Sequence, residues 1–121
     1  MEVRQGDVFW IDLDEPRGSE PGFTRPFVVV QNNVFNRSRI NTVLVCALTT
    51  NTSRANAPGN VVLKKGEANL PKGSVVVVSQ ALAVDRRDLR DRVGTLSKDR
   101  IDEIIAGIKL LIEPREIDEK E

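Results

Sequence analysis

Histidine and tyrosine are absent from this chain of 121 residues, and cysteine occurs only once, as Cys46. Histidine is the commonest general acid or base near neutral pH, so its absence excludes the histidine-dependent ribonuclease and serine-hydrolase arrangements. A single cysteine cannot form an internal disulfide, and without histidine it has no obvious partner for a metal site or a cysteine–histidine pair. Any catalysis must use Arg, Lys, Asp, Glu, Ser, Thr or backbone groups. We expect Cys46 to be a small buried hydrophobe.

The chain also lacks a long apolar run. No stretch approaches the roughly 18 apolar residues that would suggest a membrane span, and the polar N-terminus leads directly into predicted structure. A chain of this length supplies one core and is too short for two. We therefore expect a soluble, cytoplasmic protein with a single domain at residues 1–113 and an acidic, frayed tail at residues 114–121.

Acidic residues are missing from one long segment. The whole chain balances 18 basic against 18 acidic residues, yet no Asp or Glu occurs from residue 21 to residue 66. Arginine suits a polyanionic ligand, because its guanidinium is always charged and its planar fork matches phosphate geometry. The segment predicts a basic face, unless its cations are ordinary solvated charges. Its six basic residues are Arg25, Arg37, Arg39, Arg54, Lys64 and Lys65.

Short β-rich runs recur with turn signals between them, which predicts a small barrel or sandwich instead of alternating β and α units. Polar loops are expected at 33–41 and 49–60, and the charged stretch 85–91 indicates a solvated turn or one short helical turn. Four consecutive valines from Val75 indicate a strand that is buried on both faces. The predicted strands are 8–13, 26–32, 42–48, 61–64 and 74–84, and residues 92–96 could close the sheet.

One helix is predicted near the C-terminus. Ser97 is a good N-cap, and Asp99 lies in the first turn. Apolar residues then recur at helical spacing until Glu113 and Pro114 end the helix. These residues are Ile101, Ile104, Ile105, Ile108, Leu111 and Ile112.

Arg25 stands at the entrance of a valine-rich strand, directly after a polar loop that is flanked by Gly18 and Gly22. A fixed arginine at this place predicts a phosphate clamp. Glu20 is the one acid of the loop, and it is a candidate for a general base or for recognition of base edges by hydrogen bonds. A solvated surface carboxylate is the third interpretation of Glu20.

Residues 18–32, with the sequence GSEPGFTRPFVVVQN, resemble the MazF/PemK family of toxin endoribonucleases. Segments 6–13, 36–37, 58–61 and 94–96, and the strand that runs into Leu48-Thr49, are similar to the family in order and spacing, so the resemblance covers roughly residues 2–112. It implies a mainly β fold, a small SH3-like β-barrel of the CcdB/PemK type with a C-terminal α-helix. It further implies a homodimer that cleaves single-stranded RNA at short motifs without a metal or other cofactor, and a cognate, MazE-like antitoxin that silences it.

In that family the arginine before the proline and the threonine after the third strand are the catalytic pair, which implies Arg25 and Thr49 here. Thr50 is adjacent, and strand alternation lets only one threonine face Arg25; Thr49 is the better match because it directly follows Leu48. Polar residues around the expected pocket are candidates for RNA binding. They are Ser19, Gly22, Asn32, Asn36, Arg37, Thr50, Thr52, Ser53, Arg54 and Gln80.

RNA can be cut without a metal when its own 2′-hydroxyl attacks the adjacent phosphorus, which leaves a 2′,3′-cyclic phosphate and a free 5′-hydroxyl. Arg25 suits stabilisation of the phosphorane, and Thr49 could add one hydrogen bond to the developing charge. Arginine stays protonated in proteins, so Arg25 is a poor general base. An antitoxin with an acidic, partly apolar tail should lie across the Arg25 groove and compete with RNA.

Two other functions are compatible with the same fold. A toxin could bind a protein target such as gyrase, but relatives of that kind use an apolar tail with Trp-Gly-Ile, whereas residues 116–121 of this chain are mostly acidic. A non-catalytic SH3-like module could bind RNA through the basic face without using Arg25 and Thr49 as a catalytic pair. Substitution of Arg25 separates these functions from cleavage.

Overall fold

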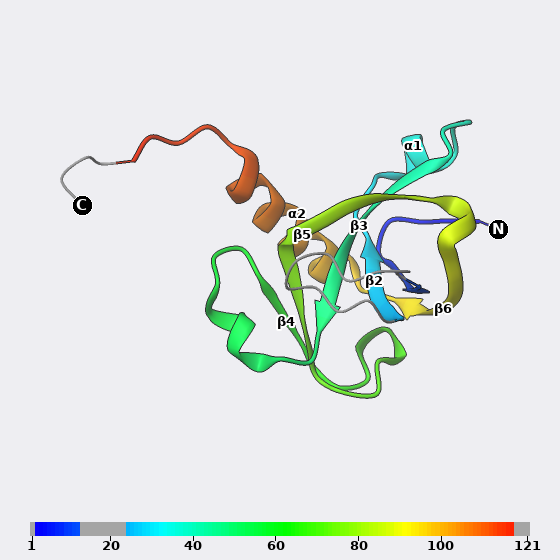
Figure 1. Ribbon diagram of the computed structural model, residues 1–121. Helices are drawn as coiled ribbons and strands as arrows, with labels where there is room; N and C mark the ends of the chain where they lie inside the picture. The colour runs from blue at the N-terminus through cyan, green and yellow to red at the C-terminus, as the bar shows by residue number, and fades with distance from the viewer. Residues whose placement is uncertain (1, 13–23, 118–121) are drawn as a thin grey trace.

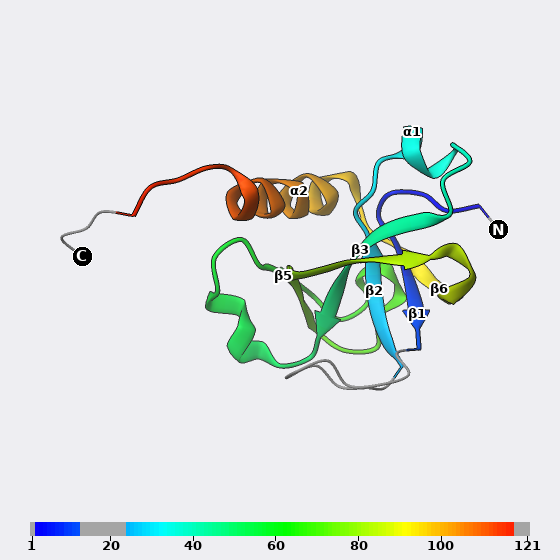
Figure 2. The ribbon, with the colours of Figure 1, turned by 45° about the horizontal axis from the view of Figure 1, so that its top comes forward.

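The computed structural model describes residues 2–12 and 24–117. Six strands gather in one body, and a long helix lies against it, with the segment after this helix leading away (Figures 1 and 2). Neither α-helix in the described part of the chain is long and apolar enough to cross a membrane. The elements in chain order are β1 (Asp7–Ile11), β2 (Arg25–Val29), α1 (Asn33–Asn36), β3 (Thr42–Thr49), η1 (Thr52–Asn56), β4 (Val61–Leu63), η2 (Glu67–Asn69), β5 (Ser74–Asp85), η3 (Arg86–Asp88), β6 (Leu89–Thr95) and α2 (Lys98–Ile112).

The strands form one antiparallel sheet in the order β4-β5-β3-β2-β1-β6. The sheet is strongly curved (Figure 2). Its edge strands are β4 and β6, which do not pair with each other, so it is not a fully closed barrel. The mainly β, barrel-like fold with a C-terminal helix, as predicted from the sequence, is confirmed. Each predicted strand is present, with ends that differ by a few residues.

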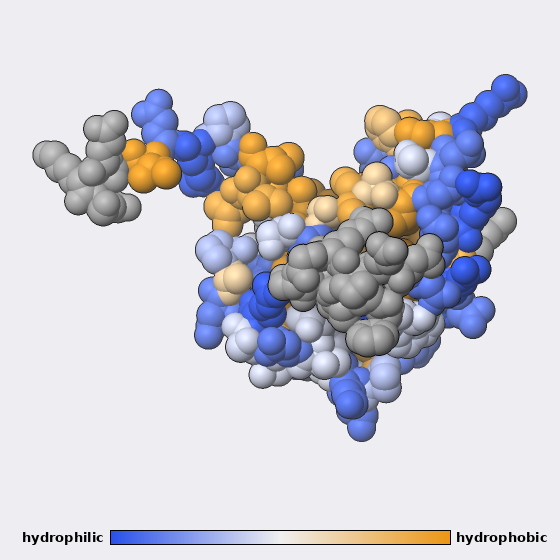
Figure 3. Space-filling model, in the orientation of Figure 1, coloured by the Kyte–Doolittle hydropathy of each residue, from blue (hydrophilic) through white to orange (hydrophobic). Residues whose placement is uncertain are grey.

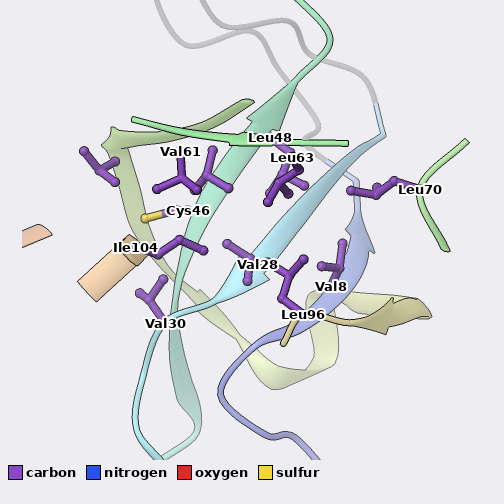
Figure 4. Close-up of a cluster of buried hydrophobic side chains, with 12 residues drawn as sticks. Val8, Val28, Val30, Cys46, Leu48, Val61, Leu63, Leu70, Leu96 and Ile104 are labelled. Atoms are coloured by element: carbon purple, nitrogen blue, oxygen red, sulfur yellow. The ribbon is translucent and has the colours of Figure 1, made fainter. Parts of the chain in front are cut away.

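Strand alternation divides the apolar residues between the two faces of the sheet. One face packs against α2, where Ile104 meets Val28 and Cys46 of the central strands (Figure 4). The other face holds the large side chains of Phe9 and Phe27, which are both buried. Burial on both faces explains why β2, β3 and the first half of β5 consist almost entirely of apolar residues.

β5 contains a bulge in its long pairing with β3. Cys46 pairs with Ala81, but the next residue, Ala47, pairs with Val77, so residues 78–80 are skipped by the register. Extra residues on one strand of a pair bend that strand and redirect its side chains. β5 turns sharply along its course in Figure 1. The bulge therefore decides where the polar residues in the middle of this strand point.

The structure refines the prediction at residues 33–41 and 89–91, and it adds η1 within the expected loop at 49–60. The expected loop at 33–41 begins with α1, because the Asn32 side chain accepts hydrogen bonds from the backbone N–H groups of Val34 and Phe35, at 3.0 and 3.3 Å, and so caps the helix. β6 begins at Leu89, three residues before the predicted segment, because Leu89 is buried within an otherwise charged stretch. The single helical turn predicted in 85–91 is present as η3.

α2 starts as predicted, with the Ser97 hydroxyl accepting a hydrogen bond from the backbone N–H of Arg100. An ion pair then ties the first turns of the helix to η2. The Arg100 guanidinium donates to both carboxylate oxygens of Glu67, at 2.9 and 3.1 Å, and to Glu103 at 2.9 Å. The hydrogen bonds from Arg100 hold the pKa of Glu67 below its ordinary value. This contact and Ile104 together fix α2 on the sheet.

Candidate active site

A polar pocket of about 360 Å³ lies where β2 begins and β3 ends, beside η1 and the bulge of β5. Two guanidinium groups border it, and no carboxylate does among the residues that the structure describes. The pocket is therefore suited to a negatively charged ligand. Its lining residues are Arg25, Pro26, Leu48, Thr49, Thr50, Asn51, Arg54, Ser74 and Gln80.

Arg25 is the first residue of β2 and is partly buried. Its Nη2 donates a hydrogen bond to the backbone carbonyl of Leu48 at 3.1 Å, and its Cζ lies 5.9 Å from the centroid of the Phe27 ring. These two contacts come from β3 and from β2 itself, so the rigid sheet orients the guanidinium. A preoriented guanidinium loses little conformational freedom when it binds an anion.

Thr49 is the last residue of β3, and the pairing of β2 with β3 brings it to Arg25. Phe27 pairs with Ala47 in this register; Arg25 and Thr49 each lie two residues beyond that pair, and both line the pocket. The Thr49 Oγ1 accepts a hydrogen bond from the backbone N–H of Asn51 at 3.1 Å. A hydroxyl that accepts in this way can still donate its own hydrogen to a ligand. Thr50 also lines the pocket, although it is more exposed than Thr49.

The chain turns from β3 into η1 through Asn51. The Asn51 side chain caps η1, because its Oδ1 accepts hydrogen bonds from the backbone N–H and the hydroxyl of Ser53, at 3.1 and 2.7 Å. η1 then brings Arg54 to the pocket wall, partly buried. η1 thus supplies a second cation to the pocket lining, at a position where it could contact the backbone of a nucleic acid.

Gln80 belongs to the bulge of β5 and lines the same pocket. Its Oε1 is buried, and no residue in the described part of the chain donates a hydrogen bond to it. Such an acceptor costs free energy in the empty pocket, since water no longer solvates it. The family resemblance favoured Gln80 as a contact in the groove, and Gln80 lines the pocket while its neighbour Ser79 is exposed.

Cys46 lies in the core behind the pocket and is buried, as expected. Burial raises the pKa of its thiol to about 12, because a thiolate would be poorly solvated there. The thiol therefore stays protonated at neutral pH and has no nucleophilic character. Within residues 2–12 and 24–117, no group of three His, Cys, Asp or Glu side chains is arranged to hold a metal ion.

The pocket brings together five of the residues that the sequence singled out. These are Arg25, Thr49, Thr50, Arg54 and Gln80. Thr52 and Ser53 lie next to it in η1 but do not line it. Ser19, Glu20 and Gly22 lie outside the described residues.

Three predicted RNA contacts lie elsewhere. Asn32, Asn36 and Arg37 follow the far end of β2, because β2 runs away from the pocket that Arg25 enters. Asn36 is 3% exposed, and its Nδ2 donates to the Gln31 carbonyl at 2.8 Å and to the Asn33 Oδ1 at 3.2 Å. Its amide thus stabilises α1. The predicted basic face is likewise divided, since Arg25 and Arg54 reach the pocket whereas Arg37 and Arg39 are exposed beyond β2.

Sequence reasoning missed two lining residues, Asn51 and Ser74. Asn51 could have been found, because Asn followed by Thr-Ser is a capping pattern directly after the predicted strand. Ser74 begins β5 and is 5% exposed, and its hydroxyl donates to the Lys72 carbonyl at 3.1 Å. No sequence signal distinguishes it from an ordinary residue at the start of a strand.

Comparison with known proteins agrees with this geometry. The family model described as "PemK-like, MazF-like toxin of type II toxin-antitoxin system" matches residues 4–112. The chain is 35% identical over 113 residues to the endoribonuclease MazF6 of Mycobacterium tuberculosis and to the endoribonuclease MazF2 of Mycobacterium bovis, covering 93% of this chain and 99% of each relative.

Solved structures of this family share the fold. A mycobacterial endoribonuclease in complex with its cognate antitoxin aligns with a TM-score of 0.74 at 22% identity, over 94% of this chain and 99% of the other. MazF from Deinococcus radiodurans aligns with a TM-score of 0.75 at 21% identity, over the same shares. With the family model covering nearly the whole folded body, this chain belongs to the PemK-like, MazF-like toxins of type II toxin–antitoxin systems.

Proposed function

We propose that this protein is the endoribonuclease toxin of a toxin–antitoxin pair, and that it cleaves single-stranded RNA, including mRNA, at short sequence motifs. The observation that carries the proposal is that Arg25 and Thr49, from the adjacent strands β2 and β3, line the same pocket together with Arg54. The curated relatives named endoribonuclease support the activity. An mRNA substrate puts the protein in the cytoplasm.

The reaction begins when the 2′-hydroxyl of the RNA attacks the adjacent phosphorus, with the 5′-oxygen of the next nucleotide as the leaving group. The Arg25 guanidinium binds the phosphoryl oxygens, whose negative charge grows as the phosphorane forms. The Thr49 hydroxyl donates one more hydrogen bond to that charge. The leaving 5′-oxygen takes up a proton from solvent, so the products are a 2′,3′-cyclic phosphate and a 5′-hydroxyl, and no step needs a metal or another cofactor.

The general base is a separate question, because Arg25 keeps its proton. Glu20 is the candidate, either as the base that accepts the proton of the 2′-hydroxyl or as a contact to base edges. The polar residues that line the pocket beside Arg25 and Thr49 bind the RNA. Arg54 contacts the phosphate backbone, while Thr50 and Gln80 face the bases or sugars.

The cognate antitoxin covers this pocket. The mycobacterial relative was solved with its cognate antitoxin, and a structure of MazE with MazF is known from Deinococcus radiodurans. Because the side chains of Arg25 and Arg54 both line the pocket, an acidic antitoxin segment has the complementary charge to occupy it. Such a segment competes directly with RNA, and rising salt weakens both complexes.

Two copies of the chain pair through exposed apolar side chains. One patch follows β2, and a second patch lies on α2 and β4; both are visible in the view of Figure 3. Apolar clusters of this kind on a small protein mark interaction surfaces. The first patch consists of Val34, Phe35, Ile40 and Leu44, and the second of Val62, Leu110, Leu111 and Ile112.

The activity is tested by incubating the purified protein with RNA of mixed sequence in the presence of a metal chelator and mapping the new ends. We expect cyclic-phosphate and 5′-hydroxyl ends at a short motif, and no cut where the scissile nucleotide is 2′-deoxy. Arg25→Ala should lower the rate by about 100-fold or more, whereas the control Arg39→Ala, an exposed arginine away from the pocket, should cleave normally. Cleavage that needs added metal, or an active Arg25→Ala variant, contradicts the mechanism; binding without any cleavage identifies a non-catalytic module.

A further inference from the structure

In the bulge of β5, the backbone N–H of Val78 is bound by the side chain of Asn60. The register with β3 skips residues 78–80, and the pairing of β5 with β4 ends at Val76, so Val78 has no paired residue on either neighbouring strand. Instead its N–H donates to the Oδ1 of Asn60 at 3.1 Å. A buried N–H without a partner would be costly, so this amide oxygen stabilises the bulge.

The same amide also holds η1, a second segment that lines the pocket. The Asn60 Nδ2 donates to the backbone carbonyl of Arg54 at 2.9 Å. One side chain therefore joins η1, which carries Arg54, to the bulge, which carries Gln80. Asn60 itself does not line the pocket. Its amide uses its acceptor and one of its donors within the fold, which leaves it little to offer to a ligand.

The backbone around Asn60 is held from behind by α2. Gly59, with a φ of +79°, and Gly107 approach so closely that a Cβ on Gly107 would lie 2.1 Å from the carbonyl oxygen of Gly59. The turn before β4 thus rests directly on the helix backbone. Asn60 therefore directly follows a glycine that packs against α2, and its side chain bonds to η1 and to the bulge of β5.

We infer that Asn60 is a positioning residue for RNA cleavage: through its two hydrogen bonds it sets the spacing between Arg54 and Gln80 across the pocket, without touching the RNA. This inference rests on the proposed ribonuclease function. Displacement of pocket groups by about 1 Å can lower a catalytic rate by about 100-fold, so loss of this link should be visible in kinetics.

The test compares Asn60→Asp with Asn69→Asp. Both changes replace an amide by a carboxylate of the same shape, and both remove an Nδ2 hydrogen bond to a backbone carbonyl, since Asn69 donates to Val93 at 3.1 Å between η2 and β6. The urea unfolding midpoints of both variants are measured first, so that their activities are compared under conditions in which both proteins are folded. We expect Asn60→Asp to lower kcat/KM by about tenfold or more, whereas Asn69→Asp should leave it unchanged.

A double-mutant cycle with Arg54→Ala separates positioning from general loss of stability. If Asn60 acts by orienting Arg54, the effect of Asn60→Asp on the affinity for an uncleavable RNA, 2′-deoxy at the scissile nucleotide, should shrink in the Arg54→Ala background. A loss of global stability would lower affinity equally in both backgrounds. Asn60→Ala adds a structural readout, because amide hydrogen exchange at Val78 should become faster when its acceptor is removed.

Each result bears on one proposal only. Folded Asn60→Asp protein that cleaves as well as Asn69→Asp overturns the positioning role, and so does an undiminished effect in the Arg54→Ala background. If the wild-type protein fails to cleave RNA at all, the proposed function fails, while the exchange of the Val78 amide still reports whether Asn60 holds the bulge.

Discussion

At the scale of single residues, Gln80 combines two properties that rarely occur together. It lines a polar pocket, and its Oε1 is buried without a hydrogen-bond donor among residues 2–12 and 24–117. A buried acceptor without a donor destabilises a protein unless a ligand supplies the donor. Phosphate oxygens cannot donate, but 2′-hydroxyls and the N–H groups of bases can. Gln80 thus supplies what the two arginines lack, an acceptor that reads a donor of the RNA.

Gln80→Met tests this role, because methionine has a similar shape but no acceptor. Removal of the unsatisfied oxygen should stabilise the free protein by about 1 kcal/mol while weakening the binding of uncleavable RNA. Opposite changes in stability and affinity are not expected from a purely structural residue. Urea unfolding and RNA titration measure the two quantities.

The control is Gln31→Met. The Gln31 amide is fully engaged, since its Nε2 donates to Asn36 and Thr42, and its Oε1 accepts from the N–H of Leu44. Its replacement should destabilise the protein and leave RNA affinity unchanged. A Gln80→Met protein that is destabilised like Gln31→Met, or that binds RNA as tightly as the wild type, would contradict the acceptor role.

At the scale of elements, the close contact between α2 and the turn before β4 makes Gly107 sensitive to any side chain. Alanine normally favours a helix over glycine by about 1 kcal/mol. Here the new Cβ would meet the Gly59 carbonyl at 2.1 Å, and a backbone atom cannot move away cheaply. We expect Gly107→Ala to lower the free energy of unfolding by about 1–3 kcal/mol.

Gly73→Ala is the matched control for Gly107→Ala, because the nearest atom to a Cβ at position 73, the Leu63 carbonyl oxygen, would be 3.6 Å away. It should be neutral or slightly stabilising, as alanine restricts the unfolded chain. Urea unfolding measures both variants. Equal midpoints for Gly107→Ala and wild type would show that α2 can shift on the turn without cost.

The elements differ in how far the sequence could predict them. Residues 42–48 and α2 were predictable within a residue or two, since apolar periodicity and the Ser97 cap are local signals. The bulge was not, because four consecutive valines look alike whether or not the register of β3 shifts beside them. β6 was only partly found, because a single buried Leu89 within charged residues gives no alternating pattern.

The candidate site divides in the same way. Arg25 and Thr49 were found through the family resemblance, and the register of β2 with β3 supplies a physical reason for their pairing. Asn60 was not found, since a polar residue after Pro-Gly reads as an ordinary turn. Its role depends on the backbone N–H of Val78, a residue that is paired with neither β3 nor β4, and that is a tertiary property.

At the scale of the whole molecule, the exposed apolar side chains are distributed unevenly. Ile112 at the end of α2 is 70% exposed, and Phe35 in α1 is 52% exposed, although both are apolar enough to be expected in a core. The proposed homodimer gives these side chains a partner surface. In that case the last turn of α2 contributes to association, while its middle, around Gly107, supports the turn beside the pocket.

We therefore expect the wild-type protein, without antitoxin, to have twice the 13.5 kDa mass of one chain at micromolar concentration. Ile112→Glu and Phe35→Glu should shift it toward the monomer, because a carboxylate in an apolar interface loses its hydration without gaining a partner. Ile117→Glu is the control, since Ile117 is 85% exposed beyond the helix and outside both patches. Sedimentation equilibrium measures the masses. Neither side chain is buried in the single chain, so the added charge should not disturb folding itself. A monomeric wild type, or a dimer that tolerates both substitutions, would therefore contradict the proposed role of these patches in the interface.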